Sequence, residues 1–261
     1  MNDHVLIRIE GPALYLTLEN VGRKNALSIA VLRQLQSALR SIKSDVTRIV
    51  FIQGAGGVFS AGADLNDISG TAKDVDYDLL TQEVCQTIKS IPMPVAALVE
   101  GPCMGAAVEL ALSCDLRIAA SDSFFQVPAT RLGLLYKPDA IAALHRKFGA
   151  EVMMRLMVLG ERFTAQSALQ AGLVGEVAEA AQLLVRAKAL ADLAAKTDPT
   201  AAGLTKKLLT ELGDDTADRV AWRAKYVAML SSPARKERIE KAKAKSTGAK
   251  SHAPQKKMER N

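Results

Sequence analysis

Residues 94–120 read PVAALVEGPCMGAAVELALSCDLRIAA, and this stretch indicates the fold. Residues 94–100 and 115–120 are short apolar runs with the length of buried strands. Residues 104–113 lie between them and are small and apolar on nearly every side, which is typical of a helix that is buried all round. A strand, a helix and a second strand in this order predict a parallel β-α-β unit.

The pattern continues on both sides of this unit. Further strands are predicted over Val5–Glu10, Ala13–Leu18 and residues 48–53, and further helices over residues 28–41 and 78–90. After about Asp139 the pattern is helical, apart from residues 173–177. We therefore expect three regions: a β/α core over residues 1–195, a helical oligomerisation region over 196–245, and a basic, disordered tail over 246–261.

The net charge of +6 is concentrated at the C-terminus. Residues 232–261 carry ten Lys/Arg and three Asp/Glu, a balance of +7, and the rest of the chain has a balance of −1. The body of the protein therefore gives no sign of binding nucleic acid. No apolar run reaches the ~20 residues that span a bilayer, and residues 1–10 lack a signal-peptide core, so we expect a cytoplasmic protein without a membrane partner.

The cysteines and histidines are few and scattered. Three cysteines without a CxxC pair argue against a disulfide framework and a zinc site. The three histidines are far apart and match no metal motif, and so few histidines make a His-based catalytic triad hard to build. The sequence therefore predicts no metal site.

Two loops of small residues each lead toward a helix. They read FSAGADL at residues 59–65 and GPCMGAAVEL at residues 101–110. A helix N-terminus leaves unpaired N–H groups and a partial positive charge, and small side chains let a ligand oxygen approach them. Two such N–H groups that converge on one point form an oxyanion hole.

Glu109 is a carboxylate within the otherwise apolar helix. Burial of a charge is costly unless the group is paired or used. Two interpretations remain open: Glu109 is half of a structural ion pair, or it is an acid/base whose pKa burial raises toward the working range.

Four ordered motifs give the chain a resemblance to the crotonase (enoyl-CoA hydratase/isomerase) family over about residues 5–232. They are Gly22-Arg23-Lys24-Asn25-Ala26-Leu27, residues 49–65, residues 94–120, and Leu159-Gly160 with residues 165–174. The resemblance implies an α/β fold of crotonase type, with a β-β-α superhelical core and a helical C-terminal region. It also implies a homotrimer or hexamer and an acyl-CoA substrate, with no cofactor beyond the coenzyme A of that substrate.

The resemblance also assigns roles to residues. It implies that the backbone N–H groups of Ala63 and Ala106 hold the thioester oxygen as it becomes an enolate, and that Glu109 is the first of the two catalytic glutamates of hydratases. The remaining predicted substrate-binding residues, most of them on the coenzyme A side, are Lys24, Ala26, Ala61, Asp64, Leu65, Gly105 and Ala129.

The second glutamate of hydratases is missing. The sequence has Pro128-Ala129 where hydratases have Pro-Glu, and alanine can neither accept nor give a proton. Tyr136 aligns with a tyrosine of the methylmalonyl-CoA decarboxylase branch, which also lacks that glutamate, so Tyr136 is a candidate catalytic residue. Asp139 is a candidate alternative acid.

Three functions therefore remain open. The main expectation is an enoyl-CoA hydratase or isomerase of lipid metabolism, and the first alternative is a decarboxylase of a malonyl-type CoA ester. The second alternative is a non-catalytic relative that binds acyl-CoA or RNA. Glu109 favours an enzyme, whereas Ala129 and the basic tail favour a specialised role.

Overall fold

The computed structural model describes residues 4–250, with side chains over residues 4–244, and the chain divides after Asp215 into two compact units. Helix α9 (Pro233–Lys250) continues into the segment that was expected to be a disordered tail. The rest of that segment, residues 251–261, lies outside the described residues. The expected boundary after residue 195 falls between two helices of the first unit, α6 (Leu183–Ala194) and α7 (Pro199–Gly213).

A six-stranded sheet forms the centre of the first unit, in the order β1-β2-β3-β4-β6-β9. Only the β1–β2 pair is antiparallel, and the other neighbours are parallel. Its strands are β1 (Val5–Glu10), β2 (Ala13–Leu18), β3 (Ile49–Gly54), β4 (Val95–Val99), β6 (Leu116–Ala120) and β9 (Glu176–Ala178). The predicted β-α-β unit is confirmed, because β4 and β6 are parallel neighbours and α3 (Ala106–Ser113) connects them.

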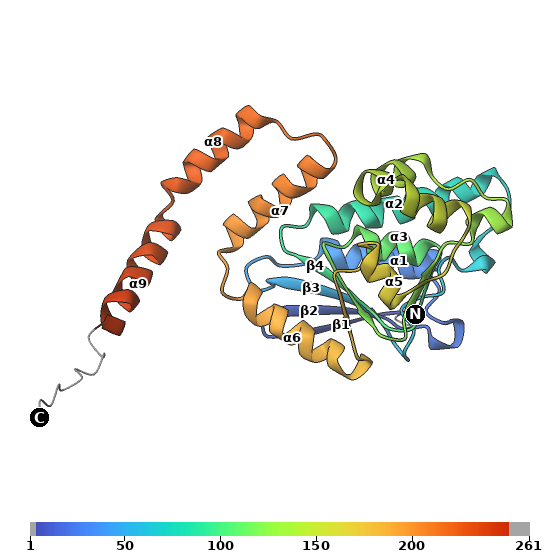
Figure 1. The fold of residues 1–261 in the computed structure, drawn as a ribbon, viewed down its shortest axis with the longest axis horizontal. Coiled ribbons are helices and arrows are strands. Elements are labelled where there is room, and N and C mark those ends of the chain that lie inside the picture. Colours follow the sequence, from blue (N-terminus) through green and yellow to red (C-terminus); the bar gives the residue numbers. More distant parts are fainter. Residues whose placement is uncertain (1–3, 251–261) are drawn as a thin grey trace, which may run out of the picture. The chain divides into compact units, whose positions relative to one another are not determined.

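Alternate residues of each strand face opposite sides of this sheet, as the period of two requires. On one side Leu14, Val50 and Ala97 pack into a core with the helices α1 (Ile29–Arg40), α2 (Val75–Ser90) and α3. On the other side Tyr15 and Phe51 stack at 5.0 Å between ring centroids, in a smaller core under α6. Figure 1 shows α6 on the opposite side of the sheet from α1 and α3.

A three-stranded sheet lies beside the main one, and the sequence did not predict it. It consists of β5 (Pro102–Met104), β7 (Phe124–Gln126) and β8 (Phe163–Thr164). Strands of two or three residues are too short to show an alternating pattern. A bridge between Ser60 and Cys103 joins β5 to the start of the first small-residue loop.

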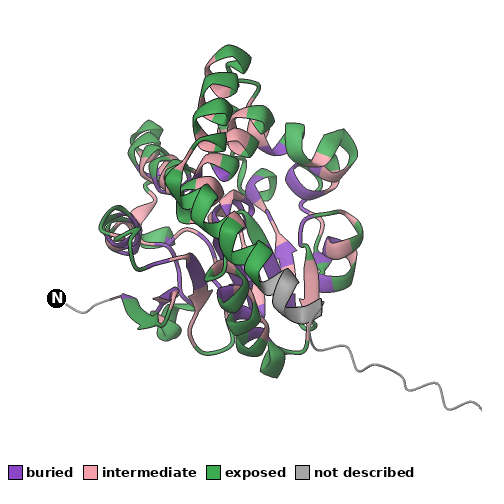
Figure 2. Ribbon diagram, turned by 90° about the vertical axis from the view of Figure 1, so that its left-hand side faces the viewer, coloured by how far each residue is buried: buried purple, intermediate pink, exposed green. Residues whose placement is uncertain are grey.

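The remaining helices pack around these sheets. They are α4 (Pro138–Met153), interrupted at Gly149, the π-helical turn η5 (Met154–Val158), α5 (Ala165–Gln170), and the short 3-10 turns η1 (Val21–Arg23), η2 (Leu65–Asp67), η3 (Ala72–Asp74), η4 (Ala129–Leu132) and η6 (Ala180–Gln182). Buried residues concentrate on the strands, whereas the outer sides of the helices are exposed (Figure 2).

A buried lysine anchors α7. The Lys206 ammonium lies 2.7 Å from Asp115 Oδ2, and it donates to the carbonyls of Ile88 and Met93 at 3.0 Å. Three oxygen partners satisfy the three N–H donors of the ammonium, and these contacts offset the free-energy cost of burying its charge. The contact fixes α7 against the segment that connects α2 to β4.

The second unit contains α8 (Arg219–Leu230) and α9. Asp218 begins α8 by accepting hydrogen bonds from the N–H groups of Val220 and Ala221, which satisfies two free donors of the first turn. The exposed apolar side chains of α8 are Val220, Tyr226, Val227 and Leu230. Over residues 4–250, no helix is long and apolar enough to cross a membrane.

Candidate active site

The first small-residue loop is held by the turn before α1. Leu27 N–H donates to Gly62 O at 2.7 Å, and Asp64 N–H donates to Leu27 O at 3.3 Å. These two bonds form a parallel bridge between Leu27 and Ala63, and they use the carbonyl of Gly62 and the N–H of Asp64. The N–H of Ala63 therefore points away from Leu27.

Glycine at position 62 allows this loop to touch the second one. Gly62 has φ +91°, and a Cβ at this position would lie 2.5 Å from Met104 O and 3.4 Å from Ala106 N. Any side chain here would therefore force the two loops apart. The close approach brings the segment of Ala63 against the start of α3.

The second loop ends where α3 begins. Gly105 has φ +52°, and its N–H donates to Gln126 O in β7 at 2.8 Å, so the small sheet fixes the turn before the helix. Ala106 is the first residue of α3, and its N–H is one of the free donors of the helix N-terminus. Within residues 4–244, neither this N–H nor that of Ala63 donates a hydrogen bond. These are the features of a site for a developing negative charge.

Glu109 follows Ala106 by three residues and therefore lies on the same face of α3, about 4.5 Å along its axis. Side chains on a helix lean toward its N-terminus, which directs the carboxylate of Glu109 toward the free N–H of Ala106. The predicted acid/base and the second predicted oxyanion residue thus share one helix face.

One oxygen of Glu109 is occupied and the other is free. Tyr136 donates its phenolic hydrogen to Oε2 at 2.8 Å, and the Lys137 ammonium lies 2.9 Å from the same atom. Oε1 has no hydrogen-bond partner in the described part of the chain, where every fully buried side-chain oxygen has one. Oε1 is therefore reached by solvent, although Glu109 is only 5% exposed.

The ion pair with Lys137 resolves the two interpretations of Glu109 in part. Glu109 is one half of an ion pair at 2.9 Å, and its second oxygen, Oε1, is still free for an acid/base role. Burial and the charge of Glu109 raise the pKa of Tyr136 well above its usual value, so the phenol stays protonated and acts as a donor. Burial likewise raises the pKa of Asp78, and its main-chain oxygen lies 3.4 Å from Lys137 Nζ.

The residues predicted to bind coenzyme A lie around the turn that precedes α1. Lys24 and Asn25 have positive φ values, and the buried Asn25 amide holds this turn by donating to the carbonyls of Ala55 and Val58. Lys24 is exposed, and its carbonyl accepts from Ala61 N–H at 2.9 Å. Lys24 is therefore an accessible cation beside the first loop.

Asp64 and Leu65 differ in exposure, although they are neighbours. Asp64 is buried, accepts from Asn66 N–H and pairs with Arg23 at 2.6 Å; these contacts lower its pKa. Leu65 is 70% exposed, and Ala26 is buried. Asp64 thus has a structural role in the loop, whereas Leu65 is free to contact a ligand.

Ala129, which stands where a second glutamate was expected, and Asp139, a candidate replacement for that glutamate, are placed differently. Ala129 is buried in η4, and no carboxylate replaces it there. Asp139 is exposed at the start of α4, where it accepts from Gln82 at 3.3 Å. No hydrogen bond joins it to Glu109, so the structure gives no support to Asp139 as the second acid.

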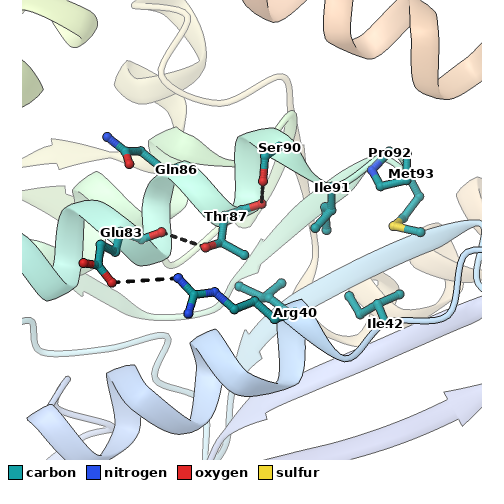
Figure 3. Close-up of a pocket in the computed structure, with 10 residues that line it drawn as sticks. Arg40, Ile42, Glu83, Gln86, Thr87, Ser90, Ile91, Pro92 and Met93 are labelled. Atoms are coloured by element: carbon teal, nitrogen blue, oxygen red, sulfur yellow. Dashed lines mark hydrogen bonds and ion pairs between the residues drawn. The ribbon is translucent and has the colours of Figure 1, made fainter.

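A pocket of about 580 Å³ lies elsewhere, between the C-terminal ends of α1 and α2. Leu39, Ile42 and Met93 provide apolar parts of its wall, and Arg40 and Glu83 pair across its rim at 3.9 Å (Figure 3). None of the predicted site residues lines it, so we do not assign the acyl-CoA site to this pocket.

The sequence model of the family described as enoyl-CoA hydratase/isomerase matches residues 8–250. The chain belongs to this family. The protein named "Probable enoyl-CoA hydratase" of Mycobacterium bovis is 33% identical over 229 residues, which cover 88% of this chain and 86% of that protein. Methylmalonyl-CoA decarboxylase of Escherichia coli is 32% identical over 199 residues, covering 75% of this chain and 76% of that protein.

The structural comparison confirms the predicted crotonase fold. The structure of an enoyl-CoA hydratase/carnithine racemase from Magnetospirillum magneticum superposes with a TM-score of 0.87 at 27% identity, covering 94% of each chain. Membership of the enoyl-CoA hydratase/isomerase family and the crotonase fold thus agree over nearly the whole sequence.

Sequence reasoning missed one residue of this site, Lys137. Its signal was indirect: a glutamate in an apolar helix needs a cation, and Lys137 follows Tyr136 directly, in the loop that enters α4. Residue 137 lies outside the four motifs that carry the family resemblance, so only the folded chain shows the pair with Glu109.

Proposed function

We propose that this protein acts on acyl-CoA thioesters through an enolate, most simply as an enoyl-CoA hydratase or isomerase. One observation supports this most strongly: the accessible oxygen of Glu109 lies on the same helix face as the free N–H of Ala106, which adjoins the loop of Ala63. A proton-transfer group and two main-chain donors are the parts that enolate chemistry requires.

In the proposed reaction, the N–H groups of Ala63 and Ala106 bind the thioester oxygen. They stabilise negative charge as it develops, and as main-chain groups they need no particular side chain. Glu109 Oε1 moves the proton, since Oε2 is held by Tyr136 and Lys137. This chemistry calls for no metal and no cofactor beyond the coenzyme A of the substrate.

We place the coenzyme A end of the substrate at the turn before α1. Lys24 would pair with a phosphate, and Leu65 would cover an apolar part of the ligand, because both side chains are exposed beside the first loop. Ala26, Ala61 and the Asp64–Arg23 pair would shape the surface beneath it.

Decarboxylation of a malonyl-type CoA ester is the second candidate. Loss of carbon dioxide leaves the same enolate, which the same two N–H groups would stabilise. The hydrogen bond between Tyr136 and Glu109, and the similarity to a methylmalonyl-CoA decarboxylase, favour this alternative over a purely binding role.

The substitution Glu109→Gln tests the proposal. We expect turnover of the best acyl-CoA substrate to fall by ~10²-fold or more, with the Kd for the CoA ester nearly unchanged, because the amide keeps the shape but cannot accept a proton. Glu151→Gln, at an exposed glutamate of α4, is the control and should behave as wild type. Undiminished turnover of Glu109→Gln would exclude Glu109 as the acid/base.

We also propose that the protein assembles as a trimer or hexamer. The exposed apolar side chains of α8 support this, since contiguous apolar surface marks an interaction site. Light scattering at micromolar concentration should give at least three times the monomer mass, and a monomer would refute the proposal.

A further inference from the structure

We propose that Lys137 is the second proton-transfer residue of the reaction and replaces the carboxylate that Ala129 lacks. It would give a proton to the α carbon while Glu109 takes one from water. This inference rests on the proposed function and specifies how a site with one glutamate can complete a hydration.

Lys137 is held at the site by its backbone and by its charge. It directly precedes α4, where its carbonyl accepts from Ile141 N–H at 3.0 Å, so its backbone is fixed by the helix. Its side chain is 11% exposed, and Nζ lies 2.9 Å from Glu109 Oε2. The ammonium thus lies next to the acid/base but keeps access to solvent.

The ammonium has a donor to spare. One N–H group faces Glu109 Oε2, and a second makes a long 3.4 Å contact with Asp78 O. The third has no acceptor in the part of the chain that the structure describes. A nearly buried lysine with a free N–H beside an accessible carboxylate oxygen is suited to donate a proton to a substrate.

The proton balance closes without a second carboxylate. Glu109 Oε1 takes a proton from water, whose oxygen forms a bond to the β carbon. The π electrons of the α–β double bond pass into the enolate. When the enolate collapses, its electron pair takes a proton from the Lys137 ammonium and forms the α carbon–hydrogen bond.

The two residues then reset each other. After one turnover Glu109 is a carboxylic acid and Lys137 is a neutral amine. The acid returns its proton to the amine across the 2.9 Å contact, which restores the ion pair. The net change is the addition of one water, with a hydroxyl on the β carbon and a hydrogen on the α carbon.

Arginine distinguishes this role from a structural one. A guanidinium keeps the positive charge beside Glu109, but it cannot be deprotonated in proteins. If Lys137 only holds Glu109 in place, Lys137→Arg should retain activity. If Lys137 transfers a proton, Lys137→Arg should be as inactive as Lys137→Met.

The experiment compares crotonyl-CoA hydration by wild type, Lys137→Arg, Lys137→Met and Glu109→Gln. Lys147→Arg is the matched control: this lysine lies within α4, which Lys137 precedes, and it also donates to a carbonyl, that of Leu112, at 3.0 Å. Butyryl-CoA, which cannot be hydrated, gives the Kd for the ester, and melting temperatures show that each variant folds.

We expect both Lys137 variants to lose ~10²-fold or more in kcat, with the Kd for butyryl-CoA changed less than about threefold. Lys147→Arg should match wild type. Near-wild-type hydration by Lys137→Arg would overturn the proposal, and if Lys137→Met does not fold, the arginine variant still decides. If Glu109→Gln loses hydration but both Lys137 variants keep it, the role of Lys137 is overturned and the proposed function stands.

A second measurement separates this inference from the proposed function. Wild type incubated with butyryl-CoA in D2O reports enolate formation by exchange of the α hydrogens, even where hydration is absent. Exchange without hydration would overturn the role of Lys137 in hydration and would leave the proposed enolate chemistry intact. Neither exchange nor hydration would overturn both.

Discussion

Gly62→Ala tests whether the contact between the two loops forms the anion site. The new Cβ would lie 2.5 Å from Met104 O, about 1 Å short of ordinary van der Waals contact at roughly 3.4 Å. The Met104 oxygen is a main-chain atom, and the new Cβ is fixed to the main chain of the first loop. The clash is therefore relieved only if one loop moves away from the other. Ala63 follows the substitution directly, and Ala106 is two residues after Met104.

The magnitude follows from the size of this movement. A misplacement of about 1 Å costs about 10² in rate, and the loss of one oxyanion donor costs about 10²–10³ in kcat. We therefore expect kcat to fall by about 10²-fold, which corresponds to ~2.7 kcal/mol. The positive φ adds a stability cost of about 1–2 kcal/mol.

The control separates the clash from the backbone strain. Gly172→Ala places a side chain at φ +73° with no atom within 4 Å, so it has a similar backbone cost without a clash. Steady-state kinetics and chemical denaturation of both variants decide the question. If Gly62→Ala keeps a kcat within about threefold of Gly172→Ala, the loop contact does not shape the anion site.

Three further substitutions have expected outcomes. Ala129→Glu should raise crotonyl-CoA hydration if the pocket keeps the family geometry, whereas an unchanged or lower rate would show that this position is dispensable. Lys206→Met should lose about 2–4 kcal/mol in urea denaturation, because it removes the cation beside Asp115, which keeps only its hydrogen bond from Val95 N–H, and the donor to two carbonyls. Exposed Lys207→Met should change stability by less than about 0.5 kcal/mol. The lowered pKa of Asp64 stabilises the fold above about pH 4, and this contribution is lost as the pH falls through the folded-state pKa. The stability of Asp64→Asn, measured as the pH is lowered, should lack that loss. An acid transition unchanged from wild type would refute the assignment.

The sequence predicted the main sheet because its strands are long enough to show a pattern. β1 and β2 begin and end where predicted, and Ser28 caps α1 through Val31 N–H at 3.2 Å. By contrast, the small sheet was missed, because pairing of two or three residues depends on distant segments and leaves no local period. Helix α3 begins two residues later than expected, since β5 takes the residues up to Met104.

The site was predictable where motifs carry main-chain geometry, as at Gly62 and Gly105. It was not predictable where two side chains meet across the fold. Lys137 and Glu109 are 28 positions apart, and nothing local to either residue encodes the 2.9 Å contact. Asp139 was a candidate because it lies near the region where some relatives place an alternative acid, but its carboxylate accepts a hydrogen bond from Gln82.

The anion-binding groups that we propose at Ala63 and Ala106 are peptide N–H groups, and this has a consequence for how such enzymes diverge. Mutation can replace a side chain in one step, but it cannot delete a peptide N–H except by introducing proline. The enolate-stabilising part of the site therefore survives while the surrounding acids and bases are exchanged. A lineage can lose a glutamate and recruit a neighbouring amine or phenol without passing through a form that no longer stabilises the enolate.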